Sequence, residues 1–363
     1  MRVPLRILDT GLLTARRNLA LTAALAELHR GGVIPDTLRF QHFAASAIVG
    51  RHQSLAREVR LDRCREKGVE TARRMTGGGA IYMGPGLLGW ELIADRARLP
   101  VGLDAITRRL CTGLAVGLSG LGIAAAFRPR NDIEVDGRKI SGTGGYIDGR
   151  TLVFQGTVLM DFDVADMADV LVLPTMKPGR LGLTAMADRV TSLRVLLGQS
   201  PPVEEVCAAV TQGVTEGLAG VIGSAPERGI LSDQEQSLAD RLYDEEIGTE
   251  AFVAGSDCAI GDRTIVRSRQ IPAGMLEVSI SIRQPTDDRI SRIWIMGDFF
   301  ATPPRAIPDL EAALVGVRVS QASSVARSFL ASRPVELLGG TIDDITAVIA
   351  DAASVIEHGV PIP

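Results

Sequence analysis

The chain has 363 residues, of which 46% are hydrophobic and 23% charged, and its formal net charge is −4 at pH 7. This composition is typical of a globular protein with two or three domains rather than a disordered chain. The acidic balance argues against nucleic-acid binding, and because no basic segment leads into an apolar run and no stretch of about 18 apolar residues occurs, we expect neither a signal peptide nor a membrane span.

The four cysteines are widely separated, at Cys64, Cys111, Cys207 and Cys258. None belongs to a Cys-x-x-Cys pair or to a Cys/His cluster with the spacing of a zinc site. We therefore expect reduced cysteines in a cytoplasmic protein and no structural metal.

The first half of the chain alternates helical and strand-like segments. Apolar spacing predicts helices over 17–30, 55–68 and 104–122, the second of them closed by Gly68. Strand patterns occur at 37–43, 46–51, 69–74, 80–83 and 87–94. The dipeptides Asp136-Gly137 and Asp148-Gly149 lie between apolar flanks and predict three antiparallel strands within 131–163.

After helical segments at 191–197, 203–222 and 232–243, the pattern changes. Three alternating segments, at 261–271, 275–284 and 289–300, predict strands, and two or three helices follow. We therefore predict an α+β protein. Its large domain, residues 1–245, would hold a mixed or antiparallel sheet flanked by helices, and residues 246–363 would form a smaller α+β domain.

The segment "RRMTGGGAIY", residues 73–82, joins two arginines to three consecutive glycines. Glycine lets a ligand approach the main chain closely, successive N–H groups bind anions, and arginine adds planar cationic donors. The segment is equally compatible with a flexible turn between two strands that carries solvated arginines.

Only three lysines occur among 39 basic residues, namely Lys67, Lys139 and Lys177. Lys139 lies in "VDGRKISGTGG", where exposed backbone and a compact charge could together hold an anion, although a solvent-facing strand lysine is the commoner outcome. Asp132 precedes an apolar strand and could hold Mg²⁺ together with phosphate oxygens, or it could simply belong to a turn. A Walker P-loop is excluded, because no G-x-x-x-x-G-K-[ST] occurs.

Together these motifs resemble the lipoate–protein ligases of the biotin/lipoate ligase superfamily. The similarity covers "NLALTAAL", "IVGRHQSLAREV", "RRMTGGGAIY", "NDIEVDGRKISG" and "GLTAMADRVTSL" in the family's order, and the tail resembles its small accessory domain. The glycine-rich and lysine motifs are specific in combination, whereas either alone would be weak.

The resemblance implies that lipoate or octanoate attacks the α-phosphate of Mg-ATP to give an acyl-adenylate, and that a lysine of a lipoyl-carrier domain then accepts the acyl group. It implies that Lys139 is the catalytic residue and contacts the acyl carbonyl and the α-phosphate. The implied adenylate-binding residues are Arg74, Gly77, Gly78, Gly79, Ala80, Ile81, Tyr82 and Lys139, with Asp132 as the Mg²⁺ ligand. Because the accessory domain is part of the same chain, we expect a monomer.

Some positions depart from the family pattern. Met83 and Gln155 stand where the family usually has histidine, which leaves the choice of acid and acceptor open. One alternative is an ATP-independent octanoyltransferase, which needs a cysteine where this chain has Ala126, although Cys64 or Cys111 could approach in three dimensions. A second alternative is a non-catalytic protein that binds a lipoyl domain.

Overall fold

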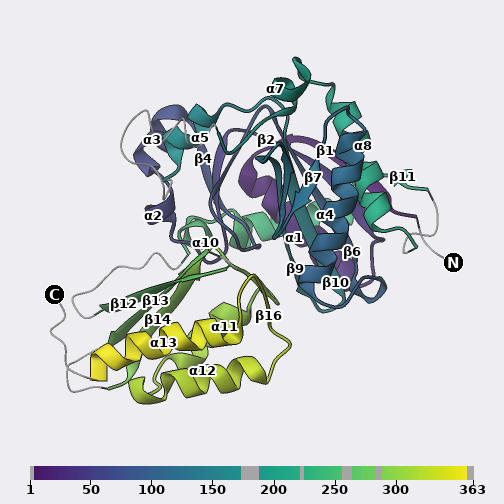
Figure 1. Ribbon diagram of the computed structural model, residues 1–363. Helices are drawn as coiled ribbons and strands as arrows, with labels where there is room; N and C mark the ends of the chain where they lie inside the picture. The colour runs from purple at the N-terminus through teal and green to yellow at the C-terminus, as the bar shows by residue number, and fades with distance from the viewer. Residues whose placement is uncertain are drawn as a thin grey trace.

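The computed structural model describes residues 4–172, 188–220, 225–255, 264–272, 274–282 and 288–357 (Figure 1). Lys177, Cys258 and the first part of the 182–193 segment lie outside these residues. The described chain forms a large unit and a smaller C-terminal unit that packs against one end of it (Figure 1).

The large unit is built on an eight-stranded sheet in the order β11-β1-β2-β6-β10-β9-β8-β7. β1 is parallel to β2 and β11, and the other described pairs of this sheet are antiparallel. The strands are β1 (Arg6–Leu13), β2 (Thr37–Phe43), β6 (Leu87–Asp95), β7 (Ala126–Arg128), β8 (Asp132–Val135), β9 (Arg138–Asp148), β10 (Thr151–Leu159) and β11 (Glu227–Arg228). A small sheet beside it has the order β4-β3-β5, with β3 (Ser46–Val49), β4 (Glu70–Arg73) and β5 (Ile81–Met83).

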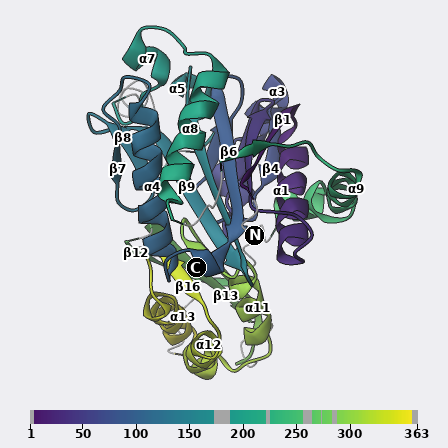
Figure 2. The same cartoon turned by 90° about the vertical axis from the view of Figure 1, so that its right-hand side faces the viewer.

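Helices cover both faces of the main sheet (Figure 2). On one face lie α4 (Leu103–Ser119) and α8 (Val203–Gly217). These two helices can approach closely because Gly113 has no Cβ; a Cβ there would lie only 2.4 Å from the carbonyl oxygen of Gly213. On the other face lie α1 (Ala15–Arg30) and α9 (Asp233–Leu242). Shorter helices are α2 (Leu55–Glu58), α3 (Leu61–Lys67), α5 (Val164–Val170), α7 (Leu193–Leu197), α10 (Glu250–Ala254), and the turns η1 (Arg96–Arg98) and η2 (Tyr243–Ile247).

The smaller unit has its own core between an antiparallel sheet, β12-β13-β14, and three helices. Its elements are β12 (Thr264–Ile271), β13 (Gly274–Ile282), β14 (Ile290–Gly297), α11 (Ala306–Leu314), η3 (Val319–Gln321), α12 (Ala322–Ala331) and α13 (Ile342–Glu357). A two-stranded ribbon, β15 (Phe300–Thr302) and β16 (Glu336–Leu338), reaches the large unit. There the Thr302 hydroxyl donates to the carbonyl of Ile147 at 2.6 Å and accepts from its N–H at 2.7 Å.

The predicted α+β class and the hairpins at 131–163 are confirmed, two local predictions are wrong, and one strand was missed. The helix expected over 55–68 is two helices, because the N–H of Arg60 donates to the carbonyl of Val170 at the break between them. The strand expected to reach residue 300 ends at Gly297, and β1 was not expected, since Asp9 and Gly11 interrupt its pattern. The domain boundary near residue 245 stays a prediction, although α10 is tied to the large unit by Arg73, which donates to carbonyls of 252–254.

No helix within the described ranges is long and apolar enough to cross a membrane.

Candidate functional site

A cavity of about 440 Å³ lies between the main sheet, the small sheet and the C-terminal unit. It brings together most of the residues that the sequence singled out. Its lining includes Arg74, Gly78, Gly79, Ala80, Ile81, Tyr82, Met83, Asp132, Lys139 and Gln155. Gly77 is the one predicted binding residue outside this lining.

The strand register makes the floor of the cavity polar on one side and apolar on the other. Gln41 on β2, Gly89 on β6 and Thr157 on β10 are cross-strand partners, and the missing Cβ of Gly89 leaves room for the ring of Phe43, from which a Cβ there would lie 2.9 Å. Two residues along, Leu87 pairs with Leu159. The apolar end is completed by Leu19, Phe43, Ile48 and Met83, so a chain of methylenes could lie there while a charged end faces polar groups.

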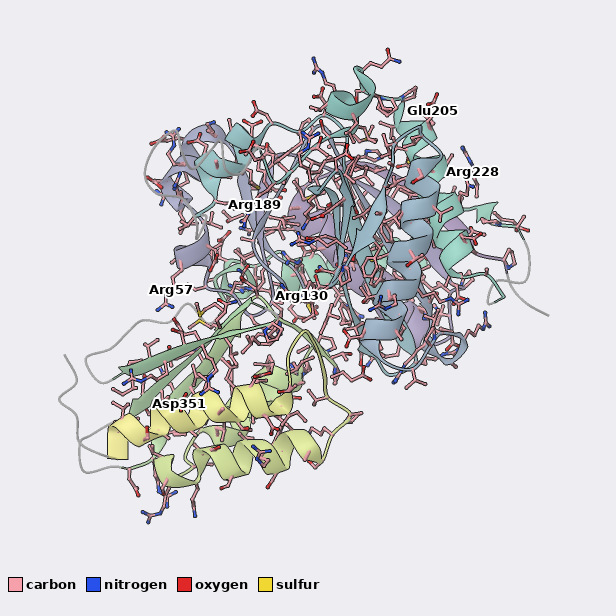
Figure 3. The ribbon with its side chains drawn as sticks, viewed as in Figure 1. Arg57, Arg130, Arg189, Glu205, Arg228 and Asp351 are labelled. Atoms are coloured by element: carbon pink, nitrogen blue, oxygen red, sulfur yellow. The ribbon has the colours of Figure 1, made fainter. Side chains whose placement is uncertain are left out.

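Lys139 is positioned by a tight hairpin and by a glycine. Its Nζ lies 2.7 Å from Oδ1 of Asp132, and the lysine side chain is 39% exposed. A Cβ on Gly142 would lie 2.7 Å from the lysine Nζ, so a larger residue there would displace the flexible end of this side chain. The N–H of Lys139 donates to the carbonyl of Arg189 at 2.8 Å, which fixes the strand beside the cavity. Figure 3 shows that Arg130, which also lines the cavity, lies between the two units.

Two carboxylates line the cavity, those of Asp132 and Asp298. Within the described residues no group of three or more His, Cys, Asp or Glu side chains is arranged to hold a metal ion. Carboxylates in a cavity that can take phosphates nevertheless fit Mg²⁺, which is bound through one or two carboxylates together with phosphate oxygens. Because Asp132 pairs with Lys139, its carboxylate would contact both the lysine ammonium and the metal ion.

The glycine loop, residues 76–80, is shaped by Arg74. The guanidinium donates from Nη2 to the carbonyls of Gly77 at 2.6 Å and Gly79 at 2.8 Å, and from Nε to the Thr76 hydroxyl at 3.0 Å. Burial lowers the pKa of Arg74 to about 10, and Asp298 opposes that shift. Since the arginine binds the loop carbonyls, the loop can present N–H groups instead, and those of Gly79 and Ala80 have no acceptor in the described part of the chain.

The C-terminal unit covers the first half of this loop, which the sequence analysis did not anticipate. The N–H of Gly78 donates to the carbonyl of Phe299 at 3.2 Å. A Cβ on Gly77 would lie 2.0 Å from that same oxygen, and Cβ atoms on Gly78 and Gly144 would lie 2.6 and 2.2 Å from the ring of Phe300. Gly77 and Gly78, together with Gly144 on β9, therefore form a docking surface for Phe299 and Phe300. Asp298, the residue before them, accepts a hydrogen bond from Gln53 at 2.8 Å.

The cysteines described by the structure are not among the residues that line this cavity. Cys111 lies on α4 under the sheet, where its sulfur is 3.2 Å from the Thr143 hydroxyl and burial raises its pKa to about 12. Burial also raises the pKa of Cys64, and it raises that of Cys207 to about 12. Ala126 is exposed on β7 at the edge of the main sheet.

The fold and the cavity define a protein that can hold an anionic group and an apolar chain side by side. The chain belongs to the lipoyl protein ligase A/B catalytic domain family, whose model matches residues 14–215. The resemblance inferred from the motifs is thereby confirmed.

The relatives of this chain are named for two different activities, octanoyl transfer and lipoate–protein ligation. The chain is 28% identical over 268 residues to octanoyltransferase LipM of Symbiobacterium thermophilum, covering 68% of this chain and 96% of that protein. It is 24% identical over 276 residues to lipoate–protein ligase 1 of Staphylococcus aureus, covering 75% and 77%. A crystal structure of lipoate-protein ligase A bound with ATP is 25% identical, with a TM-score of 0.61 over 70% of this chain and 99% of that chain.

Proposed function

We propose that the chain is an ATP-dependent ligase that activates lipoate or octanoate as an acyl-adenylate and transfers the acyl group to a lysine of a lipoyl-carrier domain. The observation that carries this proposal is a single cavity in which Lys139 and the open N–H groups of Gly79 and Ala80 adjoin an apolar pocket. The ligase structure with bound ATP supports a nucleotide in this family.

In the first step a carboxylate oxygen attacks the α-phosphorus, and the bond from that phosphorus to pyrophosphate breaks. In the second step the carrier amine attacks the acyl carbonyl, loses a proton, and AMP leaves. Negative charge grows on phosphate and carbonyl oxygens in both steps. The ammonium of Lys139 and the loop N–H groups are fixed donors for that charge, so they act electrostatically and need no covalent intermediate on the protein.

Mg²⁺, if bound, would be held by Asp132 and would neutralise charge on the phosphates. Because Asp132 pairs with Lys139, the metal ligand and the ammonium would lie at the same end of the cavity. The apolar end, with Phe43, Leu87 and Leu159, excludes water from the acyl chain.

A second candidate is an ATP-independent octanoyltransferase, which the relative named LipM favours. That activity uses a cysteine nucleophile, and a reactive thiol needs a lowered pKa and access. Three cysteines here have raised pKa values instead, and alanine occupies position 126. These observations support the ligase. A non-catalytic lipoyl-domain-binding protein is disfavoured by the presence of Arg74, Lys139 and the glycine loop in one cavity.

The two activities are separated by the acyl donor. A lipoyl-carrier domain would be incubated with the chain and either free octanoate plus Mg-ATP or an octanoyl thioester without ATP, and amide formation would be followed by mass spectrometry. The ligase transfers only from the acid with ATP. Transfer only from the thioester would overturn the proposal in favour of the transferase, and no transfer under either condition would favour the binding protein.

A further inference from the structure

We propose that Gln155 is a positioning residue that orients Thr76 and, through it, Arg74 and the glycine loop. The predicted effect of Gln155 on adenylate formation rests on the proposed function, whereas its predicted effect on the glycine loop can be measured in the free protein. Gln155 lies in a cross-strand row that runs from Arg39 on β2 through Glu91 on β6 to Gln155 on β10 and Gly144 on β9. Side chains of one such row share a face of the sheet.

The inner end of the row is a buried ion pair. Arg39 and Glu91 both have fully buried side chains, and Nε of Arg39 lies 2.7 Å from Oε1 of Glu91. The other carboxylate oxygen accepts from the Thr22 hydroxyl at 2.8 Å and from Nε2 of Gln155 at 2.8 Å. Losing a hydrogen bond of the buried carboxylate is costly, and the pair already holds one buried polar group, Nη1 of Arg39, that has no partner within the described residues.

This carboxylate decides which way the amide of Gln155 points. An ionised carboxylate only accepts hydrogen bonds, so the NH₂ group of Gln155 must face Glu91 and its carbonyl oxygen must face the other way. That oxygen lies 3.4 Å from the Thr76 hydroxyl. The hydroxyl hydrogen is therefore directed at Gln155, and an oxygen lone pair is left to accept from Nε of Arg74 at 3.0 Å.

Arg74 carries this orientation into the glycine loop. With Nε on Thr76, its Nη2 faces the carbonyls of Gly77 and Gly79, and the loop turns its N–H groups toward the cavity. Gln155 thus links a buried charge pair to the loop. The contact from Thr76 to Gln155 is long, so its contribution is direction rather than strength.

The test is a double-mutant cycle on Gln155→Leu and Thr76→Val, with Thr76→Ser as the conservative variant. The first readout is amide hydrogen exchange in the free protein at Gly78, whose N–H is hydrogen-bonded to the carbonyl of Phe299. Each single change should speed exchange at Gly78 about tenfold while β10 stays protected. The double variant should be no faster than either single one, since both break the same chain of contacts. Thr76→Ser should behave as the unchanged protein.

A matched control is Gln236→Leu, because Gln236 on α9 also donates to a carboxylate, that of Asp240, at 3.2 Å on the exposed surface. It should leave exchange at Gly78 unchanged. Unaltered exchange at Gly78 in Gln155→Leu, additive effects in the double variant, or a failure of Thr76→Ser to keep Gly78 protected would overturn the proposal.

The second readout is acid-dependent exchange of pyrophosphate into ATP, which should fall about tenfold in each single variant and no further in the double variant. If the unchanged protein shows no such exchange with any acid, the proposed function fails. The hydrogen-exchange cycle then still decides whether Gln155 positions the loop.

Discussion

Replacing Lys139 by alanine should abolish adenylate formation while leaving the fold intact. The Lys139 side chain lies on β9 at the end of the cavity that we propose binds anions, and its Nζ contacts Asp132. Charge that develops on the phosphate and carbonyl oxygens would lose its fixed ammonium partner, whereas the sheet beneath would lose little.

The two effects differ in size. The ion pair joins side chains that are 39% and 24% exposed, and such solvent-screened pairs contribute about 0–1 kcal/mol to stability. Removing one preorganised donor from developing transition-state charge typically costs about 10²–10³ in rate, or roughly 2.7–4 kcal/mol. Lys139→Arg should also fail, because the wider guanidinium directs its donors differently.

The assay is pyrophosphate exchange into ATP, run with circular dichroism and thermal unfolding on the same preparation. Lys67→Ala is the matched control, since Lys67 is also a partly exposed lysine paired with an aspartate, Asp169, but does not line the cavity. It should keep its activity. A folded Lys139→Ala protein with near-normal exchange would refute the assignment of this lysine.

Three further predictions follow from the same geometry. Removing all four cysteines should leave ligase activity largely unchanged, and loss of acyl transfer in the folded variant, together with ATP-independent transfer by the unchanged protein, would favour the transferase. Phe300→Ala should loosen the glycine loop and slow activation from ATP and acid more than transfer from a preformed acyl-adenylate, because activation needs the closed site; equal losses in both assays would mean that the ring is merely structural. Burial raises the pKa of Glu311 from 4.5 to about 7, so the folded state binds the proton more tightly and its stability falls as pH rises through that range. Glu311→Gln should therefore stabilise the protein at pH 8 by on the order of 3 kcal/mol but little at pH 5, measured by denaturant unfolding; the same gain at both pH values would contradict this reasoning.

Local sequence patterns predicted much of the architecture because they report local physics. Asp-Gly pairs can adopt a positive φ, and Asp136, Gly137 and Gly149 do so at the two hairpin turns, which sets the strand that carries Lys139. The expectation that Lys139, Asp132 and the glycine loop act at one site came from the resemblance to the lipoate–protein ligases, and the structure places them in one cavity. Their catalytic roles stay predictions.

The contacts that were missed join residues far apart in the chain. Phe299 docks on Gly78 across more than 200 residues, and nothing in a strand-like segment such as 289–300 indicates where its end will pack. The pairing of Gln155 with Glu91 was also missed, although a signal existed. Glu91 interrupts an apolar run in β6 and Arg39 lies on β2, and opposite charges on two central strands should have suggested a buried pair.

The measurement that tests the central claim most directly is exchange of labelled pyrophosphate into ATP by the unchanged protein, with and without a panel of medium-chain acids that includes lipoate and octanoate. The account predicts exchange that requires Mg²⁺ and one of these acids and that disappears in Lys139→Ala. Absence of exchange with every acid, under conditions in which the protein moves an octanoyl group from a thioester to a carrier lysine, would contradict it.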